Sequence, residues 1–562
     1  MPTLPRSTLR NTDVLVVGGG LAGLSTALFL AQQGVDCLLV ERRPELYGHP
    51  RARGVHPRAM ELLRSVGLED EVRATPSARQ LADNSGVLVA ESLAGRQLGV
   101  LDEKYVMDVH ADLGTLSPTT WCLCHQGDLE DVLRGRAERL GAAMRFHTEL
   151  VSFDQNGEPG AEITVRLRDV GTGREQEIKA RFLVAADGAR SETRATLGID
   201  FDGEALGHYV NIHFRADLTH ELGERRFLMC YTVNDAVRGA LMPLDNATEW
   251  LLHVEYDPEG EDSGAFDEDG CADLVRAATG VPHLDPQILS VTPWSGEART
   301  AGRFADGRVF LVGDAAHVMP PSGGFGSSTG IQDGHNLAWK LAAVLDGWAG
   351  PGLLDSYDQE RRPVAAATVE QAVLRSRDRL RLPGRGGEQR DVDPDLVEDT
   401  LVWLAWRYRS GAVTDWDENT LATYGVWAAE NDGRPGSRAP HLRLQHGGAE
   451  ISSLDLFGPT PVLLTGPDAG SWREAARAAA HEVGIPLAVY GIGAEVTDLD
   501  GRFPLLYRVT AQGAALVRPD GVVAWRCGDA PVFPVRVLRG VLERLLAHRE
   551  KTGADQGGDG QR

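Results

Sequence analysis

The six cysteines of this 562-residue sequence are scattered, and none of them forms a C-x-x-C pair. The pattern therefore disfavours dithiol exchange and zinc sites built from two such pairs. Cys122 and Cys124 lie beside His125, but alternate residues of a strand point to opposite faces and no second ligand pair follows, so we expect no bound metal. Unpaired cysteines are typical of a reducing compartment, and we expect a cytoplasmic protein.

Positive charge is also scarce, because 57 Lys and Arg face 81 Asp and Glu, which gives a formal net charge of −24. Nucleic acids and anionic membranes attract excess Lys and Arg, so we expect neither as a partner. Residues 14–31 are apolar enough to imitate a signal peptide or a membrane span. They contain three consecutive glycines and no small-x-small cleavage site follows them, so we expect no targeting segment. With 42% apolar residues, the chain should form several globular domains.

The N-terminal region has the pattern of a nucleotide-binding βαβ unit. Residues 14–17 form an apolar strand, residues 21–33 have a helical pattern, and a second strand ends at Glu41. A glycine-rich turn joins the first strand to the helix. This order of elements is typical of a Rossmann-like domain.

Gly18, Gly20 and Gly23 form G-x-G-x-x-G in this turn. The first glycine permits a tight turn, the second lets the backbone approach a pyrophosphate, and the third lets the helix pack against the strand. The helix N-terminus attracts the anion, and Glu41 can accept hydrogen bonds from ribose hydroxyls. These residues predict a bound adenine dinucleotide. No second such motif lies between a strand and a helix, so we expect a single dinucleotide domain.

Two acids at the ends of later apolar strands favour FAD over NAD. Asp187 follows residues 182–186, and Asp314 follows residues 309–312. A carboxylate beside a glycine-rich turn can accept hydrogen bonds from a polyhydroxyl chain, which the ribityl group of a flavin supplies and NAD does not.

The segment after the second acid is suited to a flat ring. Its Pro-Pro pair at residues 320–321 fixes φ and removes donors, and the glycines that follow leave room beside the backbone. Thr329 and Gln332 have capping-box spacing, which predicts a helix from about Gly330 to the region of Asp346. The positive end of that helix would face the ring, so we interpret the segment as a cradle for an isoalloxazine.

Three motifs in this order resemble the class A flavoprotein aromatic hydroxylases, which have the p-hydroxybenzoate hydroxylase fold. They are G-x-G-x-x-G with Glu41-Arg42, the Asp187-Gly188 stretch ending at Arg194, and GDAAHVMPPSGGFGSSTGIQDGHNLAWKL. Within that family the chain looks most like the bacterial hydroxylases of aromatic polyketides, of the tetracenomycin and anthracycline type, because of GSRAPHLRL, SSLDLFG and GAALVRPDGVVAWR near its C-terminus. The resemblance implies bound FAD, with NADPH or NADH docking transiently.

The resemblance also implies roles at matching positions. Cofactor contacts would come from Gly18, Gly20, Leu21, Ala22, Gly23, Glu41, Arg42, Arg51, Gln126, Leu150, Asp187, Asp314, Gly326, Ser327 and Ser328. Arg53 is an alternative to Arg51 for the phosphates. Many relatives have Met-Asn or Leu-Asn at Ser327-Ser328 and an apolar-Pro pair at Cys124-His125, and backbone contacts should survive the first of these differences.

Alternating segments between residues 201 and 294 predict an antiparallel sheet, one face of which should roof the flavin and line the substrate pocket. The candidates for substrate contact are His213, Tyr231, Met242, His253, Pro321 and Gly323. Asp108 and His110 are expected near the mouth of the cavity. No catalytic residue is assigned, and we interpret His317 as loop packing.

The expected fold class is α/β, with a Rossmann-like FAD-binding domain, an inserted antiparallel-sheet substrate domain and a C-terminal thioredoxin-like domain. The predicted boundaries are 1–205 and 296–385 for the FAD-binding domain, 206–295 for the substrate domain, 386–434 for a helical connection and 435–562 for the C-terminal domain. That last domain resembles one seen in relatives, and without C-x-x-C we expect it to serve packing or assembly.

The expected function is an FAD-dependent, NAD(P)H-consuming monooxygenase that hydroxylates a polycyclic aromatic polyketide or related phenol through a C4a-hydroperoxyflavin. Two alternatives remain open: a Baeyer–Villiger or ring-rearranging oxygenase, and a non-catalytic flavin-binding or assembly protein. A hydrolase on a Rossmann-like scaffold is disfavoured because it would bind no flavin, whereas these motifs predict one. Both a monomer and a homodimer fit the sequence.

Overall fold

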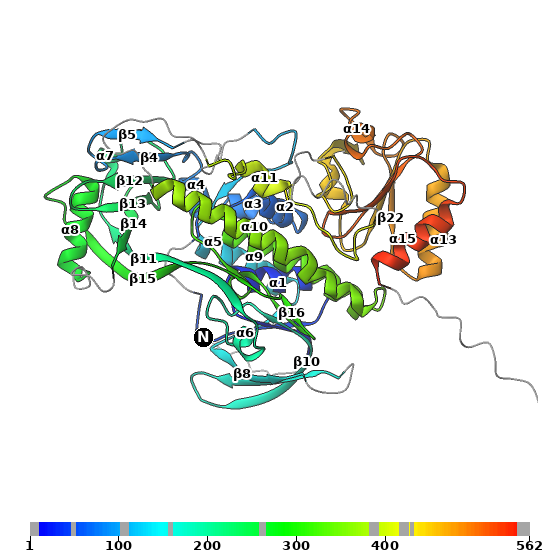
Figure 1. Ribbon diagram of the computed structural model, residues 1–562, viewed down its shortest axis with the longest axis horizontal. Helices are drawn as coiled ribbons and strands as arrows, with labels where there is room; N and C mark the ends of the chain where they lie inside the picture. The colour runs from blue at the N-terminus through cyan, green and yellow to red at the C-terminus, as the bar shows by residue number, and fades with distance from the viewer. Residues whose placement is uncertain are drawn as a thin grey trace, which may run out of the picture. The chain divides into compact units, whose positions relative to one another are not determined.

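The computed structural model describes residues 11–46, 52–101, 112–155, 161–257, 266–380, 393–414, 426–427 and 432–547, without the side chains of 378–380. Arg51, Asp108 and His110 lie outside the described residues. The chain divides into two compact units, Met1–His335 with Arg362–Leu404, and Asn336–Arg361 with Ala405–Arg562 (Figure 1). Among the described residues, no helix combines the length and the apolar character that crossing a membrane requires.

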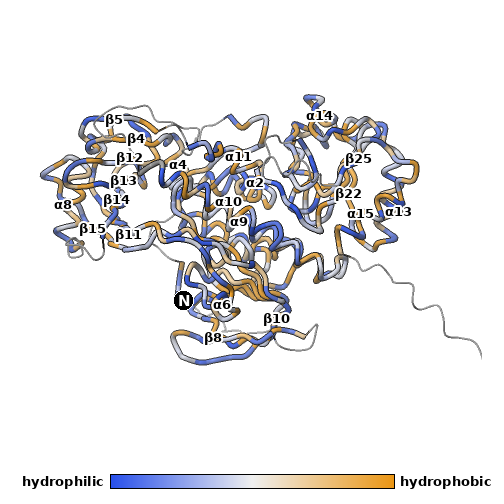
Figure 2. Tube along the Cα trace, in the orientation of Figure 1, coloured by the Kyte–Doolittle hydropathy of each residue, from blue (hydrophilic) through white to orange (hydrophobic). Residues whose placement is uncertain are grey.

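The first unit contains a mixed sheet whose central strands run parallel to one another. β1 (Thr12–Val17) pairs in parallel with β2 (Cys37–Glu41) on one side and with β10 (Glu175–Ala185) on the other, and β10 pairs with β17 (Val309–Leu311). These strands are apolar (Figure 2), and their residues are buried on both faces of the sheet, as expected for parallel strands. α1 (Leu21–Gln32) follows β1, which confirms the predicted βαβ unit. The sheet also contains β7 (Ala143–Phe146), β8 (Thr148–Asp154), β9 (Ile163–Asp169) and β16 (Ala305–Asp306).

The central strands of a second sheet come from the chain between β10 and β17, and their antiparallel pairing confirms the predicted alternation. The strand order is β18-β15-β11-β14-β13-β12-β4-β5. Helix α8 (Glu268–Thr279) packs on one face. The sequence analysis missed the two short strands at one edge, β4 and β5, because β4 joins β12 in parallel from a distant part of the chain. The strands are β4 (Val87–Ala90), β5 (Gln97–Val100), β11 (Phe201–Arg215), β12 (Met229–Val233), β13 (Arg238–Pro243), β14 (Glu249–Tyr256), β15 (Gln287–Ala301) and β18 (His317–Val318).

Helix α9 (Phe325–Leu345) begins five residues before the predicted start at Gly330, so that prediction was wrong. Thr329 does not cap the helix, because its Oγ1 donates to the Phe325 carbonyl one turn earlier. The chain turns instead at Gly323 and Gly324, whose φ angles of +87° and +65° end the preceding loop.

The first unit contains several further short elements and part of one long helix. They are β3 (Gly54–Val55), α2 (Pro57–Ser65), α3 (Glu69–Arg73), α4 (Pro76–Gln80), β6 (Cys122–Leu123), α5 (Gln126–Arg139), α6 (Glu192–Thr196), α7 (Thr219–Leu222), α10 (Asp355–Leu380) and α11 (Asp399–Leu404).

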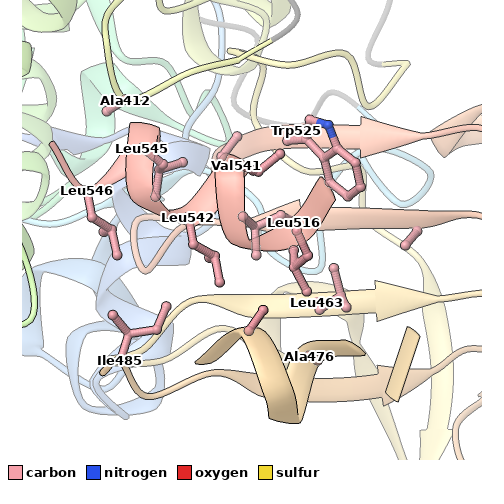
Figure 3. Close-up of a cluster of buried hydrophobic side chains, with 14 of the residues drawn as sticks. Ala412, Leu463, Ala476, Ile485, Leu516, Trp525, Val541, Leu542, Leu545 and Leu546 are labelled. Carbon is pink, nitrogen blue, oxygen red and sulfur yellow. The ribbon is translucent and has the colours of Figure 1, made fainter. Parts of the chain in front are cut away.

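The second unit is built around a four-stranded sheet of order β22-β21-β24-β25. Two helices, α13 (Gly470–Val483) and α15 (Pro534–Leu545), bury their apolar faces with one face of the sheet in a core that includes Leu463, Leu516 and Leu542 (Figure 3). The strands and the remaining short elements are β19 (Arg443–His446), β20 (Ala449–Ser452), β21 (Val462–Thr465), β22 (Ala488–Gly491), β23 (Thr497–Asp498), α14 (Phe503–Tyr507), β24 (Ala514–Val517) and β25 (Val523–Cys527).

Candidate cofactor site and substrate face

The glycine turn after β1 packs against the end of β10. Gly18 has a φ of +112°, and a Cβ there would lie 2.2 Å from the Ala186 carbonyl oxygen. A Cβ on Gly23 would lie 1.9 Å from the Gly18 carbonyl oxygen. Only glycine fits either position, and the close approach places the turn directly beside Asp187.

The start of α1 also packs against the third motif. A Cβ on Gly313 would lie 2.6 Å from the Ala22 Cβ, and one on Gly330 would lie 3.2 Å from the same atom. Arg194 ties the second motif to the third, because it donates to the carbonyls of Ala189 and Ala315, each at 2.8 Å. The three sequence motifs therefore meet at one place.

The three predicted acids have different surroundings. Glu41 is 8% exposed and accepts from the backbone of Gly19 at 2.7 Å, so it braces the glycine turn itself. Asp187 accepts from the Thr193 amide and hydroxyl through Oδ2, whereas its Oδ1 is buried with no hydrogen-bond partner among the described residues. Asp314 is exposed. A buried carboxylate oxygen and an exposed carboxylate beside a Cβ-free cradle suit a ligand that donates several hydroxyl groups.

The other predicted cofactor contacts lie on α1, on α5, on β8 and at the end of β2. Leu21 begins α1, and Arg42 is exposed at the end of β2. Gln126 begins α5; its Oε1 accepts from the Ala52 amide at 3.3 Å, and its Nε2 donates to Glu130. Leu150 is half-buried in β8, which starts beside the end of β2.

The first turn of α9 contains Gly326 and Ser327, whose amides precede any helical carbonyl partner. Ser328 is the fourth helical residue, and its Oγ accepts from the His56 amide at 3.0 Å. The hydroxyl of Ser327 donates to the Gly54 carbonyl at 3.4 Å. Because the helix starts early, the amides of Gly326 and Ser327 have no partner within the helix, and both are positions where the sequence predicted contacts to the ring.

Arg53 donates to the carbonyls of Pro243 and Leu228, each at 2.8 Å, in the second sheet. Burial lowers the pKa of its guanidinium to about 10. Both terminal nitrogens of Arg53 donate to carbonyls of the second sheet, so Arg53 is a poor alternative for the phosphate contact. Arg51 remains the residue predicted to contact the phosphates.

His317 is buried and joins the loop that carries Asp314 to α9. Its Nε2 lies 2.7 Å from Asp333 Oδ2, and the same oxygen accepts from the Gly313 amide at 3.1 Å. This pairing fits the interpretation of His317 as loop packing. The sequence analysis missed Asp333, because the i, i+16 spacing of the pair carries no local signal.

The four sheet candidates share one face. In one row across the strands, His213 pairs with Leu251 and Leu251 pairs with Met242. In a second row, Asn211 pairs with His253, His253 with Ala240, and Ala240 with Tyr231. Residues of the alternate parity, such as Ile212, Leu241 and Leu252, form the core against α8. His213, Tyr231, Met242 and His253 therefore lie on the face turned away from α8.

Two aromatic residues on this face were missed by the sequence analysis. Tyr209 and Trp294 are stacked with ring centroids 4.7 Å apart, and His253 meets both edge-on. Trp294 Nε1 donates to Asn211 at 3.1 Å. The group forms only across three paired strands, so no short stretch of sequence reveals it. We call Tyr209, His253 and Trp294 the aromatic wall.

Of the loop candidates, Pro321 is exposed and Gly323 is buried. Neither lines the cavity of about 420 Å³ that the first unit forms between β11, β15 and α10, and the four sheet candidates do not line it either.

Comparison with known proteins now identifies the family. Residues 11–372 match the model of an FAD-binding domain, and residues 432–548 match that of an aromatic-ring hydroxylase C-terminal domain. The chain is an FAD-dependent aromatic-ring hydroxylase. It is 43% identical to 4-methyl-5-nitrocatechol 5-monooxygenase of a Burkholderia species, in an alignment that covers 95% of this chain and 97% of the relative. It is 40% identical to tetracenomycin A2 monooxygenase-dioxygenase of Streptomyces glaucescens, in an alignment that covers 96% of this chain and 97% of that relative.

A solved structure is similar along almost the whole hydroxylase. The crystal structure of a ternary complex of aklavinone-11 hydroxylase with FAD and aklavinone has a TM-score of 0.87 and 39% identity, and covers 96% of this chain and 100% of that one. The hydroxylase is thus related to polyketide hydroxylases, which confirms the predicted family and FAD as its cofactor.

Acid should destabilise the hydroxylase through His56. Burial, and then the nearby Arg375, lower the pKa of this imidazole to about 3, against 6.5 for a free group. Between these values the unfolded chain binds a proton that the folded chain does not, so stability should fall as pH drops below 6.5, by about 1.4 kcal/mol per pH unit. Urea unfolding at pH 7.5, 6.5, 5.5 and 4.5 should show that the free energy of unfolding falls more steeply with decreasing pH in wild type than in His56→Gln. Equal slopes in the two proteins would contradict the contribution of His56.

Proposed function

We propose that this hydroxylase acts on a polycyclic aromatic polyketide or a related multi-ring phenol, with NADPH or NADH as reductant. The observation that carries the proposal is the aromatic wall on the face of the second sheet turned away from α8. Flat aromatic rings pack well against such side chains. The names of relatives that act on tetracenomycin A2 and aklavinone support the same class.

We infer that FAD is held where the three motifs meet. Its contacts would come from Gly18, Gly20, Leu21, Ala22, Gly23, Glu41, Arg42, Arg51, Gln126, Leu150, Asp187, Asp314, Gly326, Ser327 and Ser328. Asp187 Oδ1 and the carboxylate of Asp314 would accept from ribityl hydroxyls, and the first-turn amides of α9 would donate to the ring edge. Ser328 would contribute its backbone, because its hydroxyl is engaged by His56.

When bound, FAD supplies hydride acceptance from the nicotinamide and activation of O2. The chain's own task is to orient the phenol and exclude water. His213, Tyr231, Met242, His253, Pro321 and Gly323 are the proposed substrate contacts, to which we add Tyr209 and Trp294. Burial lowers the pKa of His253 to about 4, so this residue is neutral near pH 7 and suits packing better than charge pairing. No general base is assigned.

We propose the domain division predicted from the sequence, with boundaries at residues 205, 295, 385 and 434. The C-terminal part is proposed to be thioredoxin-like. In its support, β21, α13 and β22 form a parallel βαβ unit, and the antiparallel hairpin of β24 and β25 precedes α15. A reducing cytoplasm, where NAD(P)H is available, is the proposed location.

A single-ring substrate is the second candidate, because a relative named for a nitrocatechol is 43% identical over nearly the full length. Ring cleavage or rearrangement is the alternative outcome on a polyketide. Purified protein should show a flavin absorption spectrum and oxidise NADPH faster with an accepted aromatic. Screening multi-ring phenols beside substituted catechols separates the substrate classes, and product mass with ¹⁸O2 separates hydroxylation from ring insertion. A yellow protein whose NADPH oxidation no aromatic stimulates would contradict catalysis.

Replacing Trp294 with leucine should raise the KM for a multi-ring phenol about tenfold with little change in kcat, because the lost stacking acts on ground state and transition state alike. The measurement is steady-state NADPH oxidation with product quantified. Arg134→Ala, which removes an exposed ion pair in α5, is the control and should leave KM unchanged. An unchanged KM in Trp294→Leu would remove this residue from the proposed pocket.

A further inference from the structure

His56 contacts two segments of the third motif at once. Its backbone amide donates to Ser328 Oγ at 3.0 Å, and its Nε2 lies 3.1 Å from the Gly323 carbonyl oxygen. A carbonyl only accepts, so the imidazole carries its proton on Nε2. One residue thereby joins the glycine turn to the first turn of α9.

The imidazole is 3% exposed and enclosed by three aromatic rings. Its centroid lies 4.4 Å from Trp121, 5.3 Å from Phe325 and 5.6 Å from Trp403. Burial keeps it neutral near pH 7, so no charge is placed in this apolar enclosure. A hydrogen bond in such surroundings is stronger than one in water. If the His56 donor were removed, the Gly323 carbonyl would lose this hydrogen bond.

The turn that His56 holds needs support. Gly323 and Gly324 both have positive φ, and glycine loses more conformational freedom than any other residue when it is fixed. Two further ties are present: the Gly324 amide donates to the Pro321 carbonyl at 3.0 Å, and the hydroxyls of Ser322 and Ser376 lie 2.7 Å apart. Of these three ties, only the one from His56 comes from the segment before α2.

We propose that His56 is a positioning residue that fixes the loop of residues 320–324 in the shape needed for coupled hydroxylation. This inference rests on the proposed function, in which that loop lies against the flavin ring and the substrate. A loop that is not fixed would still let NADPH reduce the flavin, but it would orient the phenol poorly and admit water, so that reducing equivalents end as H2O2.

The test compares His56→Leu, which keeps apolar bulk but loses the donor, with His56→Gln, whose Nε2 amide can still donate. In the FAD-loaded full chain, we expect product formed per NADPH consumed to fall about tenfold in His56→Leu and to stay within about twofold of wild type in His56→Gln. FAD affinity and Tm are measured for both. The ratio of His56→Leu to wild type should not change between pH 6.5 and 8.5, because the imidazole does not titrate there.

Equal coupling in His56→Leu and wild type would overturn the inference, and so would an equal loss in both variants, since that result would assign His56 to packing alone. If His56→Leu does not fold, Ser376→Ala, which removes the neighbouring tie, should lower coupling by a smaller factor, and unchanged coupling there would overturn the inference. Failure of the proposed function is distinguishable, because the wild-type protein itself would then show no aromatic-stimulated NADPH oxidation.

Discussion

Gly18→Ala should abolish FAD binding and lower the stability of the apoprotein by about 3 kcal/mol or more. The new Cβ would lie 2.2 Å from the Ala186 carbonyl oxygen, and the backbone would keep a φ of +112°, which alanine rarely adopts. Backbone atoms must move to relieve this overlap, and they include the neighbours of Asp187. The measurements are flavin content after purification, FAD titration and thermal unfolding of the apoprotein.

Gly20→Ala is the matched control within the same turn. No atom lies within 4 Å of a Cβ at Gly20, and its φ of −82° suits any residue. The apoprotein should therefore keep its Tm, while FAD affinity falls if the backbone at residue 20 approaches the pyrophosphate. Wild-type FAD affinity in Gly18→Ala would refute the proposed cofactor site, whereas an equal loss of Tm in both variants would refute the steric argument.

Glu360→Ala should cost the second unit about 3–5 kcal/mol of stability. Glu360 is 1% exposed and accepts from Arg518 Nη2 at 2.8 Å, from Lys340 Nζ at 2.7 Å and from the side-chain Nδ2 of Asn336 at 2.8 Å. Asp520 accepts from the other side of Arg518. Without Glu360, a buried lysine and arginine would share one remaining carboxylate, and their desolvation would no longer be offset.

Glu482→Ala is the control for this prediction. Glu482 pairs with Arg539 at 3.2 Å between α13 and α15, but both side chains are 45% exposed, so the loss should stay below about 1 kcal/mol. Thermal unfolding compares the two variants, and limited proteolysis with mass spectrometry identifies which part opens first. Equal stability losses would show that burial of the Glu360 network adds nothing.

The βαβ unit and the antiparallel sheet could be predicted because their signals are local. Each signal depends only on residues close together in the sequence. These signals are the glycines of the first turn, the apolar strand of residues 14–17 and the alternating segments after residue 201. The start of α9 was misplaced because Thr329 and Gln332 imitate a capping box, while the true start depends on two left-handed glycines and on contacts to residues 54–56.

Contacts between distant segments were beyond the reach of the sequence pattern. The aromatic wall needs the register of β11, β14 and β15, and the β4 strand needs a parallel partner more than a hundred residues away. Arg51 and Arg53 look equivalent in sequence, and only the two carbonyls that Arg53 reaches distinguish them. His56 and Asp333 carry no motif at all.

The sequence by itself determined the family, the cofactor and the glycine positions, because backbone conformation and anion binding at a turn impose residue types that short motifs preserve. Only the tertiary structure decided which side chains share the face of the second sheet turned away from α8, and what holds the loop of residues 320–324. The shared sheet face depends on strand register, and the loop support depends on polar groups buried between segments far apart in the chain. Tertiary packing sets the register and this burial.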